Sequence, residues 1–171
     1  LKRPDAFDVD PRALALGRAR AHPGMRWFPS PEVREFGGIR DAAPDAWGRR
    51  VIEARLQAAP NSLDEFTYLL EAGSDRVGAL DVRGHLDALP QHTAGDLVNL
   101  PYLLQAAAAV ELGEPIPTKL MPYLGGAPSA GGARPKASVR DDDGVLWLAK
   151  FPALNDTYTM AIVEAGAMDL A

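Results

Sequence analysis

The sequence contains no cysteine and no long apolar run. The absence of cysteine excludes disulfide bonds, zinc–thiolate sites and a cysteine nucleophile, and it fits a reducing compartment. A membrane-spanning helix needs about 18 or more apolar residues in succession. The longest apolar segment here, residues 103–110, is mostly alanine and is interrupted by Gln105. We therefore expect a cytoplasmic protein with no membrane span.

The sequence also lacks an excess of basic residues. Eighteen lysines and arginines stand against 23 aspartates and glutamates, which gives a formal net charge of −5. Proteins bind phosphate backbones through basic surfaces, so this charge disfavours a DNA-binding subunit, and no helix-turn-helix pattern is present. The composition, with 47% hydrophobic and 24% charged residues, is that of a globular chain with one core or two small ones.

Glycine and proline divide the chain into units. Residues 1–40 contain several prolines and show no sustained periodicity, which predicts loops and short turns. Segment 114–124 also contains prolines and predicts a linker with one short helical turn. It would separate a mostly helical subdomain, residues 1–113, from a second unit, residues 125–171. Because the chain does not start with methionine and stops inside a helical pattern, we expect both ends to be cut.

The first subdomain is expected to contain an amphipathic helix over residues 44–58. Trp47, Val51 and Ala54 recur there at helical spacing. Pro44 suits the first turn, where its missing N–H has no helical partner.

A second helix is predicted to start at a capping box formed by residues 62–65. Phe66, Leu69 and Leu70 would form its buried face. Gly73 would end it in the left-handed conformation.

Further along, residues 76–82 predict a short buried strand. Thr93 would cap a third helix that ends at Gly113, with Pro101 as a possible kink. Its predicted apolar stripe is Leu97, Leu100, Leu103, Leu104 and Ala107.

The second unit combines a glycine-rich loop, a hairpin and a helix. Residues 137–140 and 145–151 predict the two strands, joined by a turn that contains Asp-Gly. The triple aspartate at 141–143 fits a solvated turn better than a metal site. From Asp156 onward the apolar pattern is helical.

The loop over residues 124–136 has few side chains, so its backbone amides could approach an anion closely. Arg134 and Lys136 follow and would add positive charge. The spacing does not complete a Walker or dinucleotide motif. A flexible connection between domains is therefore the alternative interpretation.

Lys150 is the one charged residue in an apolar strand, and Glu164 follows it on the predicted helix. In protein kinases a strand lysine contacts nucleotide phosphates and pairs with a glutamate on the next helix. The alternative is a lysine on the solvent side of an edge strand, with an unrelated glutamate.

These segments resemble the HipA-like serine/threonine kinases, the toxin components of bacterial toxin–antitoxin pairs. The matching stretches are DAAPDAWGRRVIE (41–53), AGSDRVGAL (72–80), SAGGARPKA (129–137) and LWLAKFP (146–152). GGARPKA is highly specific for this family. The resemblance implies an α+β fold in which the helical subdomain is followed by the start of a kinase-like small lobe.

The resemblance also implies functional roles for named residues. Those assigned to the phosphate-binding loop are Gly131, Gly132, Ala133, Arg134, Pro135 and Lys136, with Lys136 reaching the nucleotide. Lys150 would contact the phosphates and Glu164 would pair with it. Ser129 occupies the position of a serine in this family whose phosphorylation ejects the loop and stops the kinase. The alternative interpretation of Ser129 is a structural turn residue.

The implied ligands are ATP and Mg²⁺, with the catalytic aspartate and the metal ligands expected beyond Ala171. The implied partners are a protein substrate and an antitoxin, through which any DNA contact would occur. The alternative function is a non-catalytic interaction or inhibitory module. Arg49 and Arg50 could then form a partner-binding face with Trp47, although a solvated helix flank fits them better. The three histidines are interpreted as surface residues.

Overall fold

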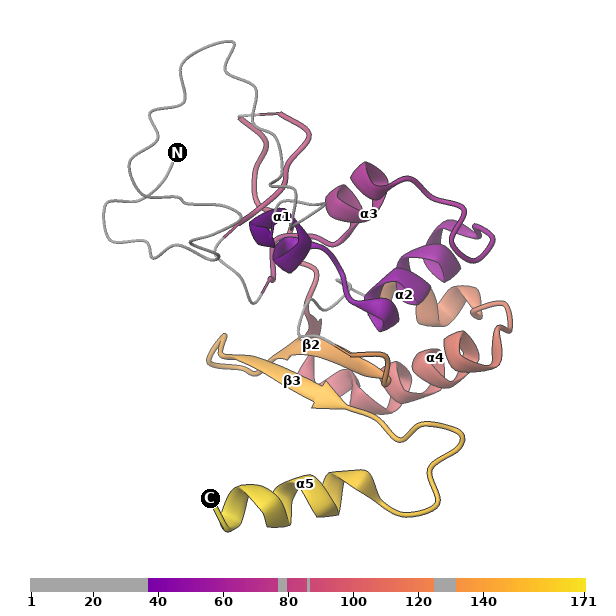
Figure 1. Cartoon of the computed structure of the whole chain (residues 1–171), viewed down its shortest axis with the longest axis vertical. Coiled ribbons are helices and arrows are strands. Elements are labelled where there is room, and N and C mark those ends of the chain that lie inside the picture. Colours follow the sequence, from indigo (N-terminus) through magenta and orange to yellow (C-terminus); the bar gives the residue numbers. More distant parts are fainter. Residues whose placement is uncertain (1–36, 77–79, 86, 125–131) are drawn as a thin grey trace.

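The computed structural model describes residues 37–76, 80–85, 87–124 and 132–171. It confirms a mixed α+β fold (Figure 1). The helices are α1 (Gly37–Ala42), α2 (Ala46–Leu56), α3 (Glu65–Glu71), α4 (Leu100–Leu112) and α5 (Met160–Asp169), with 3₁₀ helices η1 (Leu97–Asn99) and η2 (Thr118–Tyr123). The strands are β1 (Gly95–Asp96), β2 (Lys136–Arg140) and β3 (Leu146–Lys150). Of the loops predicted over residues 1–40, residues 1–36 lie outside the described residues, and residues 37–40 form most of helix α1 instead.

Helix α2 forms where the sequence predicts it. Trp47 and Val51 are buried, as their spacing indicates. The side chain of Asp45 caps the helix by accepting a hydrogen bond of 2.8 Å from the backbone N–H of Gly48. Pro44 therefore precedes the cap instead of occupying the first turn.

The start predicted for α3 is wrong by two residues. Asp64, not Ser62, caps this helix, and its side chain accepts from the backbone N–H of Thr67 at 3.0 Å. The hydroxyl of Ser62 instead donates to the carbonyl of Ala59 at 2.7 Å. Ser62 and Asp64 can both form a helix cap, but the hydroxyl of Ser62 is hydrogen-bonded within the tight turn before the helix, which leaves Asp64 as the cap.

The buried face of α3 also differs from the prediction. Tyr68 and Leu69 are buried, whereas Phe66 is 59% exposed. The hydroxyl of Tyr68 donates to Glu53 of α2 at 2.5 Å, and this contact orients the helix. Gly73 follows the helix with φ +72°, which confirms the predicted left-handed stop.

The strand predicted at residues 76–82 is not present among its described residues, 76 and 80–82. The remaining three lie outside the described residues. The sheet instead takes its third strand from β1, which pairs in parallel with Val139 and Arg140 of β2.

The third helix starts at Leu100, not at Thr93. The backbone N–H groups of Thr93 and Ala94 donate to Asp75, and the next two residues form β1, so neither segment is free to become helical. Pro101 lies in the first turn of α4, where it costs no hydrogen bond. Gly113 ends the helix with φ +69°, as predicted.

The predicted hairpin is confirmed. Strands β2 and β3 are antiparallel, with Lys136 opposite Lys150 and Arg140 opposite Leu146. In the turn, Asp141 accepts hydrogen bonds from two backbone N–H groups, and a glycine with φ +78° completes it. Helix α5 follows the hairpin, as its apolar period indicates.

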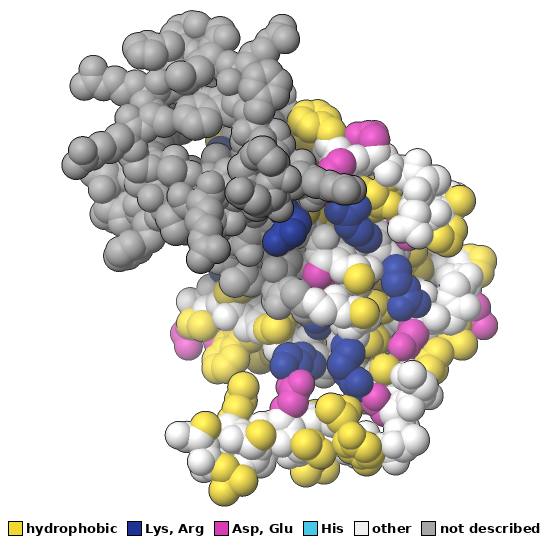
Figure 2. Space-filling view, in the orientation of Figure 1, with side chains coloured by type: hydrophobic (Ala, Val, Ile, Leu, Met, Phe, Trp, Pro, Cys, Tyr) yellow, Lys and Arg dark blue, Asp and Glu magenta, His cyan; other side chains and the backbone are white. Residues whose placement is uncertain are grey.

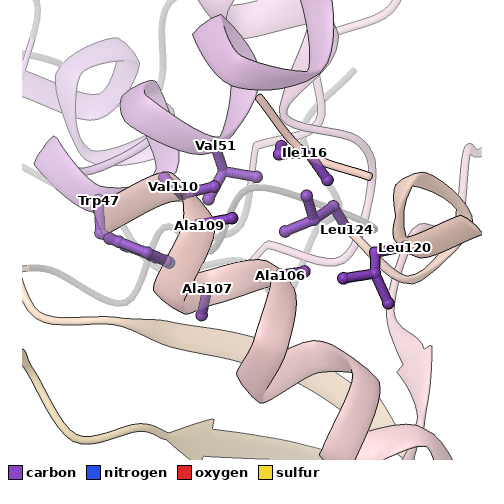
Figure 3. Close-up of a cluster of buried hydrophobic side chains, with 9 residues drawn as sticks. All are labelled: Trp47, Val51, Ala106, Ala107, Ala109, Val110, Ile116, Leu120 and Leu124. Atoms are coloured by element: carbon purple, nitrogen blue, oxygen red, sulfur yellow. The ribbon is translucent and has the colours of Figure 1, made fainter. Parts of the chain in front are cut away.

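The main core lies between α2, α4 and the segment that follows α4 (Figure 3). Its nine buried residues are Trp47, Val51, Ala106, Ala107, Ala109, Val110, Ile116, Leu120 and Leu124. The last three belong to the predicted linker, so part of residues 114–124 lies in the same core as both helices. Helix η2 confirms the helical turn predicted there, while the division into two domains stays a prediction.

Helix α5 lies on the far side of the hairpin from α2 and α3 (Figure 1). None of its residues is buried, and hydrophobic side chains gather along it (Figure 2). Four residues of β3 are also exposed. In the part of the chain that the structure describes, no helix is long and apolar enough to span a membrane.

Candidate functional site

The open end of the hairpin brings together Lys150 and Glu164. The ammonium of Lys150 at the end of β3 donates to Oε2 of Glu164 on α5 at 2.6 Å. Both side chains remain accessible, with exposed fractions of 48% and 39%. The two residues that the sequence pairs are therefore in contact. Lys150 is more exposed than a residue of a half-buried strand would be, so a ligand could reach it from solvent.

A second lysine stands directly across the sheet. Lys136 is the register partner of Lys150, and like charges at opposite positions of two strands repel. Each ammonium has its own carboxylate: Glu164 for Lys150, and Asp45 for Lys136 at 3.0 Å. These two ion pairs offset the repulsion between the lysines.

Lys136 is not accessible as Lys150 is. Its side chain is 5% exposed and that of Asp45 is 7% exposed. The ammonium also donates to the carbonyl of Gly132 at 3.2 Å. The lysine predicted to reach the nucleotide thus has two internal partners in this structure.

Arg134 also has an internal partner. Its guanidinium donates to both carboxylate oxygens of Asp156, with 2.6 Å to Oδ1. The hydrogen bond from Arg134, followed by one from the backbone N–H of Ala153, lowers the pKa of Asp156. The pair connects the end of the glycine-rich loop with the segment between β3 and α5.

Part of the predicted loop, including Ser129 and Gly131, lies outside the described residues. The described end begins with Gly132 at φ +100°, a conformation that favours glycine. Ala133 is exposed, whereas Pro135 is buried and its carbonyl accepts from the backbone N–H of Phe151 at 2.9 Å. The loop is thus held firmly where it enters β2.

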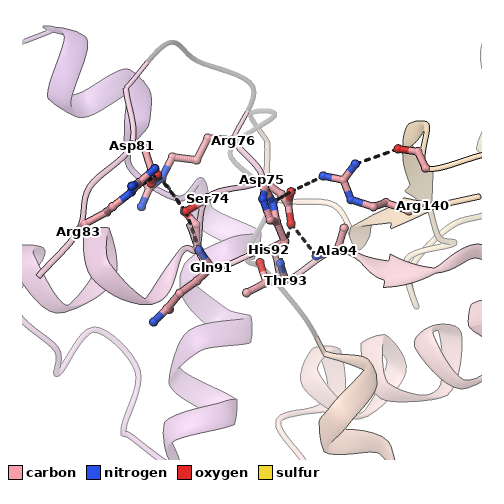
Figure 4. Close-up of polar contacts among 12 residues, drawn as sticks. Ser74, Asp75, Arg76, Asp81, Arg83, Gln91, His92, Thr93, Ala94 and Arg140 are labelled. Carbon is pink, nitrogen blue, oxygen red and sulfur yellow. Dashed lines mark hydrogen bonds and ion pairs between the residues drawn. The ribbon is translucent and has the colours of Figure 1, made fainter. Parts of the chain in front are cut away.

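Sequence reasoning missed a buried polar centre at Asp75 (Figure 4). This carboxylate is 2% exposed and accepts from Nδ1 of His92 at 2.9 Å and from Arg140 at 2.6 Å. It also accepts from the backbone N–H groups of Thr93 and Ala94 at 2.6 and 2.8 Å. Asp75 therefore ties two loops to the end of β2.

Arg76, the next residue, is equally buried. Its guanidinium donates to the carbonyl of Gly73 at 2.8 Å and to those of Ala42 and Leu69, so it joins the ends of α1 and α3. Burial lowers the pKa of Arg76. The sequence signal that could have indicated this role is an adjacent acid and base, Asp75 and Arg76, separated from a helix-ending glycine by one serine. In the structure this motif is part of the scaffold.

A separate cavity of about 900 Å³ lies between one face of α2 and the end of α4. Arg49, Arg50 and Glu53 contribute to its wall. Arg50 also donates to the carbonyls of Val110 and Glu111, both at 3.1 Å, and so caps the end of α4. This contact gives Arg50 a structural role that neither sequence interpretation of it included.

Among the described residues, no three His, Asp or Glu side chains are grouped so that they could hold a metal ion. No protein-family model, curated protein or solved structure matches the chain. The resemblance to the HipA-like kinases therefore rests on the sequence motifs alone.

Proposed function

We propose that the chain is the N-terminal portion of a HipA-like serine/threonine protein kinase, a cytoplasmic toxin with an antitoxin partner. It binds Mg·ATP through the glycine-rich loop and Lys150, and the whole protein phosphorylates a protein substrate. The observation that carries this proposal is the Lys150–Glu164 ion pair of 2.6 Å, which follows a glycine-rich loop and a hairpin. In protein kinases such a pair holds the lysine against the nucleotide phosphates.

The chemistry asked of this chain is binding and charge stabilisation. Enzymes of this class transfer phosphate mainly by positioning the nucleotide and neutralising its developing charge. An accessible ammonium at Lys150 and a loop with few side chains suit that task. The catalytic aspartate and the Mg²⁺ ligands belong, in this proposal, to residues outside these 171.

The nucleotide contact can be tested by titrating the ¹⁵N-labelled chain with millimolar Mg·ATP and following its NMR spectrum. We expect shifts of the amide signals of residues 132–134, 136 and 149–151. Lys150→Met should weaken binding about tenfold or more, because a charge-assisted hydrogen bond contributes about 1.5–3 kcal/mol. Lys119→Met, at an exposed lysine of η2, is the matched control and should bind like the wild type. Equal affinity of the wild type and Lys150→Met would contradict the proposal.

Catalysis gives two further expectations. In the full-length protein, Lys150→Ala should lower protein phosphorylation by orders of magnitude while the fold persists. The purified 171-residue chain should show neither ATPase nor kinase activity, because it supplies only part of the nucleotide clamp. Turnover by the chain alone would place a catalytic base within it.

The alternative is a non-catalytic interaction module, and the apolar exposure of β3 and α5 favours it. Trp147, Ile162 and Met168 are 55%, 71% and 75% exposed. Apolar surface of this kind commonly marks a contact with another protein. A correctly folded wild-type chain that gives no NMR shifts with millimolar Mg·ATP would favour this function over the kinase.

A further inference from the structure

We propose that Asp45 and Lys136 form a clasp that positions the nucleotide loop from the side of α2, so that Lys136 anchors the loop instead of contacting phosphate. Only the expected effect on ATP binding rests on the proposed function, whereas the contacts of the clasp do not. The clasp consists of the Asp45–Lys136 ion pair and two hydrogen bonds made by Trp47.

The ion pair is buried on both sides and well satisfied. Oδ2 of Asp45 accepts from the Lys136 ammonium at 3.0 Å, while Oδ1 accepts from the backbone N–H of Gly48 at 2.8 Å. One carboxylate therefore caps α2 and neutralises a cation 91 residues further along the chain. A buried charge is costly without such partners, so each residue of the pair depends on the other.

Trp47 connects α2 to the same short segment by two further hydrogen bonds, one at each end of the segment. The indole N–H of Trp47 donates to the carbonyl of Lys136 at 2.7 Å, and the backbone N–H of Trp47 donates to the carbonyl of Gly132 at 3.4 Å. The Lys136 ammonium also donates to the carbonyl of Gly132, so the two ends of this segment are hydrogen-bonded to each other. Residues 132–136 are thus held against the first turn of α2.

The two possible roles of Lys136, loop anchor and phosphate ligand, predict opposite changes in nucleotide affinity when the charge of Asp45 is removed. If Lys136 binds phosphate, Asp45 competes with ATP, and Asp45→Asn should strengthen nucleotide binding. If Lys136 is an anchor, Asp45→Asn loosens the loop and weakens binding, as Lys136→Met does. The burial of the Lys136 side chain, which is 5% exposed, favours the anchor.

The test compares wild type, Asp45→Asn, Lys136→Met and the double variant by hydrogen exchange. Asparagine caps helices about as well as aspartate, so Asp45→Asn removes the ion pair while keeping the cap. We expect the indole and backbone N–H groups of Trp47, which donate to the carbonyls of Lys136 and Gly132, to exchange about tenfold faster or more in each single variant. The double variant should exchange no faster than either single variant, because the two changes remove the same interaction.

Several controls keep the result decisive. The Trp147 indole, which donates to Asp141, is an internal reference in every spectrum. Protected amides in α4 show that a variant is folded, and if Lys136→Met does not fold, Lys136→Gln takes its place. Asp142→Asn, in the exposed hairpin turn, should exchange like the wild type.

Unchanged exchange in Asp45→Asn would overturn the clasp. Tighter binding of Mg·ATP by Asp45→Asn, together with weaker binding by Lys136→Met, would overturn the anchoring role and make Lys136 a phosphate ligand. If no protein in the series responds to Mg·ATP, the proposed function fails, and the exchange rates still decide whether the clasp exists.

Discussion

Asp75→Asn removes one negative charge from the point where two loops meet the end of β2, and it hardly changes the size of the side chain. The wild-type carboxylate accepts from four donors: His92, Arg140 and two backbone N–H groups. Asparagine offers one acceptor oxygen and turns an NH₂ group toward those donors. The substitution therefore leaves buried donors without a charged acceptor.

The pKa of Asp75 gives the scale of the effect. Burial alone raises this pKa, but hydrogen bonds from His92, from Ala94 N–H, from Arg140 and from Thr93 N–H together outweigh burial and lower it from 3.8 to about 2. That difference corresponds to about 2 kcal/mol of stability. Breaking a buried pair costs about 3–5 kcal/mol, although Arg140 is one-third exposed and can turn toward water. We expect a loss of about 2–4 kcal/mol at neutral pH.

The pH dependence follows from the sign of the shift. The folded-state pKa is the lower one, so the stabilisation is fully present above the unfolded-state value of 3.8 and is lost as pH falls through about 2. Urea unfolding of wild type and variant should therefore differ most at neutral pH and converge in acid. Asp142→Asn is the control and should stay within about 0.5 kcal/mol of wild type. A difference that does not change with pH would refute this account of Asp75.

Three other predictions concern the scaffold and the loop. Gly73→Ala should destabilise the chain by about 2 kcal/mol or more, because φ is +72° and a Cβ would lie 2.5 Å from Oγ1 of Thr93; urea unfolding measures this, with Gly84→Ala as control because a Cβ there meets nothing within 4 Å. Arg76→Lys should cost about 2 kcal/mol in the same assay, since an ammonium cannot reproduce the fork that holds three carbonyls. In the full-length protein with Mg·ATP, mass spectrometry should find one phosphate on Ser129, which adds a charge of about −1.5 to −2 near the nucleotide; Ser129→Asp should weaken ATP binding, and a phosphate on a different residue would contradict this role.

The elements that the sequence predicted are those specified by neighbouring residues. The Trp47–Val51 spacing defines α2, and an Asp-Gly turn between two β-prone stretches defines the hairpin. The missed elements depend on distant residues. Strand β1 has two residues and no alternation to detect, and it exists because β2 lies beside it. Thr93 looked like a helix cap, but Asp75 binds its backbone N–H.

The same distinction applies to the candidate site. Lys150 and Glu164 lie on consecutive elements 14 residues apart, and a pattern of strand followed by helix was enough to pair them. The partner of Lys136 could not be predicted in this way, because Asp45 lies 91 residues earlier and meets it only when α2 packs beside β2. A cation next to a glycine-rich loop therefore suggested a phosphate contact, and tertiary packing supplied a carboxylate.

The parallel pairing of β1 with β2 has a consequence for the order in which the protein folds. The hairpin joins residues separated by a short turn and can form quickly, but two strands alone are marginally stable in water. The third strand, β1, precedes α4 and η2 in the sequence, whereas β2 follows them. Strand β1 can therefore pair with β2 only after the chain between the two strands has closed a long loop. The hairpin is thus expected to become stable late, after α2 and α4 have packed. A cut within residues 114–124 would separate β1 from β2 and leave the C-terminal piece with a hairpin that has lost its third strand.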